Sequence, residues 1–161
     1  MNAGMKIARP EEIPWAPSLQ RGAYSQQRKP LSSEGINAGL WQLAPGKKSF
    51  PFHLHHVTDE AMYVVSGHAK VRTSDGVSEI GPGDFVSFPA GVTAHQLIND
   101  GTEPLVYLGL SVSKGHDIVE YPDAGRIAAA IGKPPTGKRF MFREKDQADY
   151  FADDPDAVEQ K

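Results

Sequence analysis

The sequence predicts an all-β domain folded as a jelly-roll barrel. Its 161 residues include 16 glycines and 13 prolines, which punctuate short apolar runs instead of gathering in one linker. Seven or eight short strands at such close spacing are typical of a sandwich or barrel, and closure of a barrel removes exposed sheet edges. A chain of this length is sufficient for one domain around a single core.

The expected strands are apolar or alternating runs that end at turn signals. The clearest turn is Ser74-Asp75-Gly76, which is typical of a hairpin, and Gly81-Pro82-Gly83-Asp84 turns the chain again shortly afterwards. The strands are predicted at 35–43, 50–56, 60–65, 68–73, 77–80, 85–88, 95–99 and 105–112.

The regular pattern of short apolar runs and turns ends after residue 121. We expect a short helix over 125–131, a peripheral strand over 139–143 and a solvated acidic tail over 153–161. The chain is thus divided into an N-terminal arm (1–34) that packs on the barrel, the barrel itself (35–121), and a peripheral helix and strand extension with its tail (122–161).

Composition excludes several classes of function. The net charge of −3 and the pI near 6.0 provide no basic surface for nucleic acid. The longest apolar stretches, among them Ala61 to Val65, have five residues, far short of the ~18 that indicate a membrane span. The first 17 residues lack the apolar core of a secretory signal, which favours a cytoplasmic protein. The absence of cysteine leaves histidine and carboxylates as the strong metal ligands.

Histidines gather in one short segment, at His53, His55 and His56, and Glu60 and His95 follow in later strands. Side chains two residues apart on a strand share a face, so His53 and His55 project together while His56 points away. Glu60 begins the next strand after a short turn, and His95 must come from a strand across the barrel. This pattern predicts a metal site.

These residues resemble the two motifs of the cupin family, G-x5-H-x-H-x3,4-E-x6-G and G-x5-P-x-G-x2-H-x3-N. Two loops are each one residue longer than in the family, between Gly46 and His53 and between Gly91 and His95. The resemblance covers roughly residues 35 to 113. The matching residues are Gly46, His53, His55, Glu60 and Gly67 in the first motif, and Gly83, Pro89, Gly91, His95 and Asn99 in the second.

The resemblance implies a double-stranded β-helix with a divalent ion, Mn, Fe, Ni, Zn or Cu, held by His53, His55, Glu60 and His95. The run 117–123 (DIVEYPD) is similar to that of small bacterial cupins, some of which are named as sugar-phosphate isomerases. An isomerase needs a base beside the metal, and Glu60 is the candidate. A metal-dependent dioxygenase and a non-catalytic sugar- or metabolite-binding protein remain alternatives.

Strand parity indicates the walls of the pocket. If Glu60 faces inward, Met62 and Val64 do so too, and Leu97 follows His95. We therefore expect a mainly apolar small-molecule pocket with no second acid or base, and with Lys47 and Lys48 at its mouth to meet a phosphate or carboxylate.

Apolar residues also occupy the opposite face of these strands. Tyr63 and Val65 alternate with Met62 and Val64, which leaves more apolar surface than one barrel interior needs. A homodimer that covers this surface is the expected assembly, as is common in the cupin family.

Overall fold

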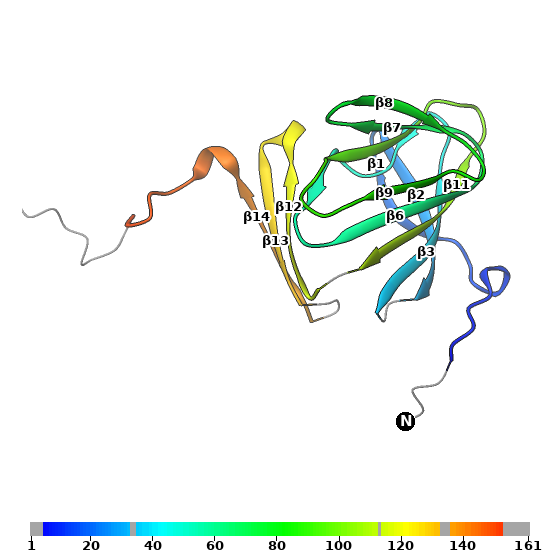
Figure 1. Cartoon of the computed structure of the whole chain (residues 1–161), viewed down its shortest axis with the longest axis horizontal. Helices are drawn as coiled ribbons and strands as arrows, with labels where there is room; N and C mark the ends of the chain where they lie inside the picture. Colours follow the sequence, from blue (N-terminus) through cyan, green and yellow to red (C-terminus); the bar gives the residue numbers. More distant parts are fainter. Residues whose placement is uncertain (1–4, 33–34, 113, 133–135, 153–161) are drawn as a thin grey trace, which may run out of the picture.

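The computed structural model describes residues 5–32, 35–112, 114–132 and 136–152, and these form two curled β-sheets. The large sheet has the strand order β8-β7-β10-β4-β2-β3-β11-β6-β9, with β1 paired to β2. The small sheet has the order β14-β13-β12-β5 and stands at one side of the barrel in Figure 1. The mostly-β architecture confirms the predicted fold class, and it is that of a double-stranded β-helix.

The large sheet contains β1 (Ala16–Arg21), β2 (Tyr24–Ser32), β3 (Ile36–Leu43), β4 (Lys47–Lys48), β6 (Asp59–Ser66), β7 (Ala69–Thr73), β8 (Gly76–Ile80), β9 (Phe85–Phe88), β10 (His95–Asn99) and β11 (Leu105–Val112). The small sheet contains β5 (Leu54–His55), β12 (His116–Tyr121), β13 (Arg126–Ile131) and β14 (Lys138–Arg143). Three short 3-10 turns are the helical elements of the described chain: η1 (Pro10–Glu12), η2 (Pro122–Ala124) and η3 (Glu144–Asp146).

The N-terminal segment adds strands to the barrel. β2 pairs with β3 over most of its length and with β4 at Tyr24, so it lies within the large sheet instead of on its surface. The barrel wall that encloses the pocket therefore begins well before residue 35.

The helix expected over 125–131 is wrong, because Arg126–Ile131 forms strand β13. Its alanine-rich run favours a helix locally. Pairing with β12 on one side and β14 on the other nevertheless satisfies its backbone groups in a sheet. The peripheral strand expected over 139–143 is confirmed as β14. The acidic tail at 153–161 lies outside the described residues.

The core lies between the walls of the barrel. Leu43, Val64 and Leu105 have no exposed surface, and the predicted inward residues Met62 and Leu97 are buried with them. Apolar side chains from strands distant in the sequence thus converge, which is the main favourable contribution to the folded state.

Register places three rows of residues side by side on the inner face of β3, β11 and β6. The first row joins Asn37, Ser111 and Glu60, the second joins Gly39, Gly109 and Met62, and the third joins Trp41, Tyr107 and Val64, with Arg28 of β2 opposite Trp41. The middle row presents two glycines in adjacent strands, so the side chains of Arg28 and Trp41 can lie against bare backbone there.

Candidate metal centre

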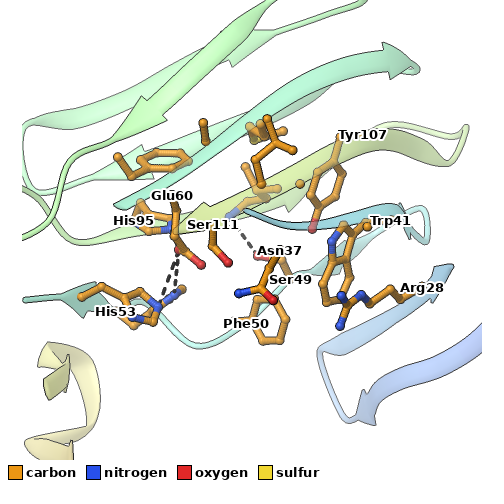
Figure 2. Close-up of a pocket in the computed structure, with 18 of the residues that line it drawn as sticks. Arg28, Asn37, Trp41, Ser49, Phe50, His53, Glu60, His95, Tyr107 and Ser111 are labelled. Atoms are coloured by element: carbon orange, nitrogen blue, oxygen red, sulfur yellow. Dashed lines mark hydrogen bonds and ion pairs between the residues drawn. The ribbon is translucent and has the colours of Figure 1, made fainter. Parts of the chain in front are cut away.

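Four side chains from three parts of the barrel meet at one end of the pocket. His53 lies just before β5 and forms an isolated bridge with His95 at the start of β10, while His55 belongs to β5 and Glu60 to β6. The Nε2 atoms of the three histidines lie 3.8, 3.6 and 3.2 Å from Oε2 of Glu60, for His53, His55 and His95 respectively. Figure 2 shows His53, Glu60 and His95 directed toward one another.

The other ring nitrogen of two of these histidines is already engaged. His53 Nδ1 lies 2.8 Å from the carbonyl oxygen of Pro51, and His55 Nδ1 lies 2.5 Å from Oδ2 of Asp117. A proton on each Nδ1 donates to these oxygens and leaves the Nε2 lone pair directed at the cluster. Both rings are therefore held in the orientation and tautomer that a metal ligand needs.

Asp117 is a buried member of the site. It is 7% exposed, and its Oδ1 accepts a hydrogen bond from the Val57 amide at 3.0 Å. Burial raises the pKa of Asp117, but hydrogen bonds from His55, Thr58 and the Val57 amide outweigh it and hold the pKa below its ordinary value. Asp117 is thus a carboxylate at neutral pH and orients His55.

The electrostatics of the cluster favour the ligand forms of its residues. Burial raises the pKa of Glu60, yet contacts with His53 and His95 and the field of His55 place the pKa well below its ordinary value. Burial is the main cause that lowers the pKa of His95, whose ring stacks on Phe88 at 3.7 Å. The cluster consequently offers an ionised carboxylate and a neutral imidazole, the forms in which these groups bind metals.

The side chains of this cluster are suited to coordinate a divalent metal ion. Among the described residues, His53, Glu60 and His95 each offer a ligand atom within 4.8 Å of the other two. His55 approaches the same carboxylate oxygen, at 3.6 Å. His56 lies apart: its Nε2 contacts Oε1 of Glu120 at 2.8 Å on the exposed side of β5, in agreement with the strand parity.

A cavity of about 440 Å³ extends from this cluster into the barrel. Met62 and Leu97 line it, as expected. Val64 does not, because its side chain is completely buried in the core. Lys47 and Lys48 also lie outside the lining, since β4 pairs with the far end of β10 at Ile98 and Asn99, away from His95.

The pocket is more polar than parity predicted. Its lining includes side chains that sequence reasoning missed: Arg28, Asn37, Tyr107, Ser111, Tyr121 and Arg139. Arg28 comes from the segment that we expected to pack on the barrel as an arm, and Tyr121 and Arg139 come from the small sheet. A signal existed for Asp117, because it opens the run 117–123, whereas no local pattern marks Arg28.

Comparisons with known proteins identify the class. The Cupin domain family model matches residues 39–112. The solved structure of a protein from Acidithiobacillus ferrooxidans is 32% identical over 77% of this chain and 80% of its own, with a TM-score of 0.70. The chain therefore belongs to the cupin superfamily.

Several of the similar solved structures have enzyme names. The Acidithiobacillus protein is named, provisionally, as a sugar phosphate isomerase. A sugar phosphate isomerase of the cupin superfamily from Silicibacter pomeroyi has a TM-score of 0.73 at 22% identity, over 84% of this chain and 91% of its own. A predicted oxalate decarboxylase from Thermotoga maritima has a TM-score of 0.59 at 20% identity, over 67% and 98%. The last two likenesses show the fold alone, and the curated proteins give no match.

No helix in the described part of the chain has the length and hydrophobicity needed to cross a membrane.

Proposed function

We propose that this protein holds a divalent metal ion at His53, His55, Glu60 and His95 and acts there on a small sugar phosphate as an isomerase. One observation carries the proposal. The three imidazole Nε2 atoms converge on one carboxylate oxygen, while the Nδ1 atoms of His53 and His55 are occupied by Pro51 and Asp117.

The bound ion would supply Lewis acidity that polarises a carbonyl or hydroxyl oxygen. The residues of the chain position the substrate beside it: Asn37 and Ser111 present polar atoms on the pocket wall, and Phe50, Phe88 and Met62 exclude water. The name of the Acidithiobacillus relative supports the choice of substrate.

An isomerase also needs a group that moves a carbon-bound proton. The lowered pKa of Glu60 suits a ligand better than a base, because a carboxylate that holds its charge strongly is a weak proton acceptor. Glu60 stays a candidate base, and Tyr121, whose ring stacks on His53 with 6.2 Å between the ring centroids, is a second candidate.

The test begins with the metal content of the purified protein, followed by assays on aldose and ketose phosphates. We expect stoichiometric metal and interconversion of one such pair, both lost in His95→Ala and retained in His56→Ala. Turnover that survives His95→Ala would refute the metal-centred mechanism. Oxygen uptake with an aromatic diol would indicate a dioxygenase, and stoichiometric binding without turnover would indicate a binding protein.

We also propose that the chain forms a homodimer. Tyr63 and Val65 on β6, and Phe85 opposite Tyr63 on β9, are 43, 49 and 62% exposed. Because β9 ends the strand order of the large sheet, this apolar face lies at a sheet edge, where association also pairs free backbone groups. Sedimentation that gives a monomer at micromolar concentration would refute the dimer. A cytoplasmic location likewise stays a prediction.

A further inference from the structure

Arg28 is a cation directed into the pocket at the end away from the metal cluster. It lies on β2 opposite Trp41, and its guanidinium carbon is 5.1 Å from the centre of the indole ring. Figure 2 shows Arg28 and Trp41 on one side of the pocket and His53, Glu60 and His95 on the other, with Asn37 and Ser111 between them.

This guanidinium has no anionic partner among the residues that the structure describes. No carboxylate lies within 4.0 Å of it, and its Nε is buried without a hydrogen-bond partner. Arg72 provides the contrast, since it donates two hydrogen bonds to Asp123, at 2.6 and 2.8 Å. An arginine stays charged in proteins, and a partly desolvated charge without a counterion is costly. The pocket is thus left with an unsatisfied positive group.

The sheet holds this group in a fixed place. A Cβ added to Gly39 would lie 2.7 Å from Arg28 Nε, and one added to Gly109 would lie 2.7 Å from Trp41 Nε1. The side chains of Arg28 and Trp41 therefore rest on bare backbone, and any other residue at either glycine would displace them. Within the described chain, the two Nη groups donate to no other residue, so they can form a bidentate contact with an anion while the guanidinium lies against the indole.

We propose that Arg28 binds the anionic group, a phosphate or a carboxylate, of a ligand whose other end reaches the metal cluster. This inference rests on the proposed function and specifies its substrate. Arg28 Nε lies beside Gly39, so the position of Gly39 marks the position of the guanidinium. Gly39 and Glu60 are two strands and two residues apart, which places about 12 Å between their backbones. One sugar-sized molecule can span this distance. Asn37 and Ser111 lie between the two ends and can hydrogen-bond the hydroxyls of such a ligand.

Trp41 provides the reporter for the test. The chain has two tryptophans, so Trp15→Phe leaves the emission of Trp41 alone. In this background we would titrate fructose 6-phosphate, gluconate, fructose and inorganic phosphate. The first carries a phosphate, the second a carboxylate and the third no charge. We expect saturable changes with at least one of the two anionic sugars and none with fructose at the same concentrations.

Arg28→Gln should weaken binding of the anionic sugar at least tenfold, and Arg28→Lys should give an intermediate loss because it keeps the charge but not the fork. Lys29→Gln is the matched control. Lys29 is the next residue on β2 and makes a cation–π contact of its own, with Trp15, on the other face of the strand. It should leave the affinity unchanged.

Metal affinity, measured on the same variants, separates this inference from the proposed function. If Arg28→Gln binds metal normally and binds the anionic sugar as tightly as the parent does, the role of Arg28 is overturned and the proposed metal centre is not. A loss that occurs only in Arg139→Gln overturns it too, because that cation lies on the small sheet. A failure of the parent to respond to any of the anionic probes also overturns it. If the protein binds no metal but binds the anion in a way that depends on Arg28, the metal centre is overturned and the anion site is supported.

Discussion

Replacement of Asp117 by asparagine tests whether the small sheet takes part in the metal centre. The substitution keeps the shape of the side chain and removes the charge that His55 Nδ1 meets at 2.5 Å. The amide can still accept one hydrogen bond, from His55 or from Val57, but not with the strength of a carboxylate. We therefore expect a weaker centre in a folded protein.

The size of the effect follows from the type of contact. Loss of a carboxylate that orients a histidine ligand typically lowers metal affinity ~10–100-fold, which is about 1.4–2.7 kcal/mol. His55 is one of four candidate ligands, so the ion would still bind. His55→Ala, which removes the ligand itself, should lower the affinity further than Asp117→Asn.

The assay is competition for Zn²⁺ with a chromophoric chelator at neutral pH, well below the unfolding temperature. Glu120→Gln is the matched control, because Glu120 on β12 makes the equivalent contact, at 2.8 Å, with His56, which directly follows β5 and lies outside the pocket. The control should bind Zn²⁺ as the parent does. An affinity of Asp117→Asn within twofold of the parent, with His55→Ala impaired, would show that His55 needs no carboxylate to orient it.

Two further predictions concern the ion and the pocket wall. Addition of Zn²⁺ or Mn²⁺ to chelator-treated protein at a hundred times its Kd should stabilise the fold by ~2.7 kcal/mol, which raises the Tm by about 5–11 °C in a chain of this size. Scanning calorimetry measures the Tm with and without the ion. A Tm of the parent that the ion leaves unchanged, and that equals the Tm of His95→Ala, would contradict the proposed metal centre. Gly109→Ala should displace Trp41, whose Nε1 and Cδ1 would lie 2.7 and 2.8 Å from the new Cβ, and cost about 1–3 kcal/mol. Denaturant unfolding measures the loss of stability, and tryptophan emission measures the displacement of the indole. Gly101→Ala, whose new Cβ would make ordinary contacts, is the control. Equal behaviour of the two variants would refute the close packing of the indole.

The sequence was most informative where local patterns determine structure. Turn signals between apolar runs predicted the barrel strands, and the spacing of His53, His55, Glu60 and His95 predicted four side chains that the fold brings together. The same local reasoning failed at 126–131, because alanine favours a helix when considered alone, whereas pairing with two neighbouring strands outweighs that small preference.

Contacts between distant segments could not be predicted in this way. Asp117 meets His55 across 62 residues of chain, and Arg28 faces the pocket only because β2 pairs with β3 in one register. Register depends on the whole sheet, since a slip by one residue would turn each side chain to the other face. The polar half of the pocket was therefore missed even though every residue in it was visible in the sequence.

The contact between Asp117 and His55 couples the docking of the small sheet to ion binding at the proposed metal centre. If docking of β12 against β5 improves the affinity for an ion by some factor, the ion must favour that docking by the same factor. A chain shortened to the family-matched segment 39–112 would lose Asp117 together with β12, β13 and β14. In the full chain, metal occupancy would therefore report on the attachment of the C-terminal strands, because separation of β12 from β5 would remove Asp117 from His55 and weaken metal binding.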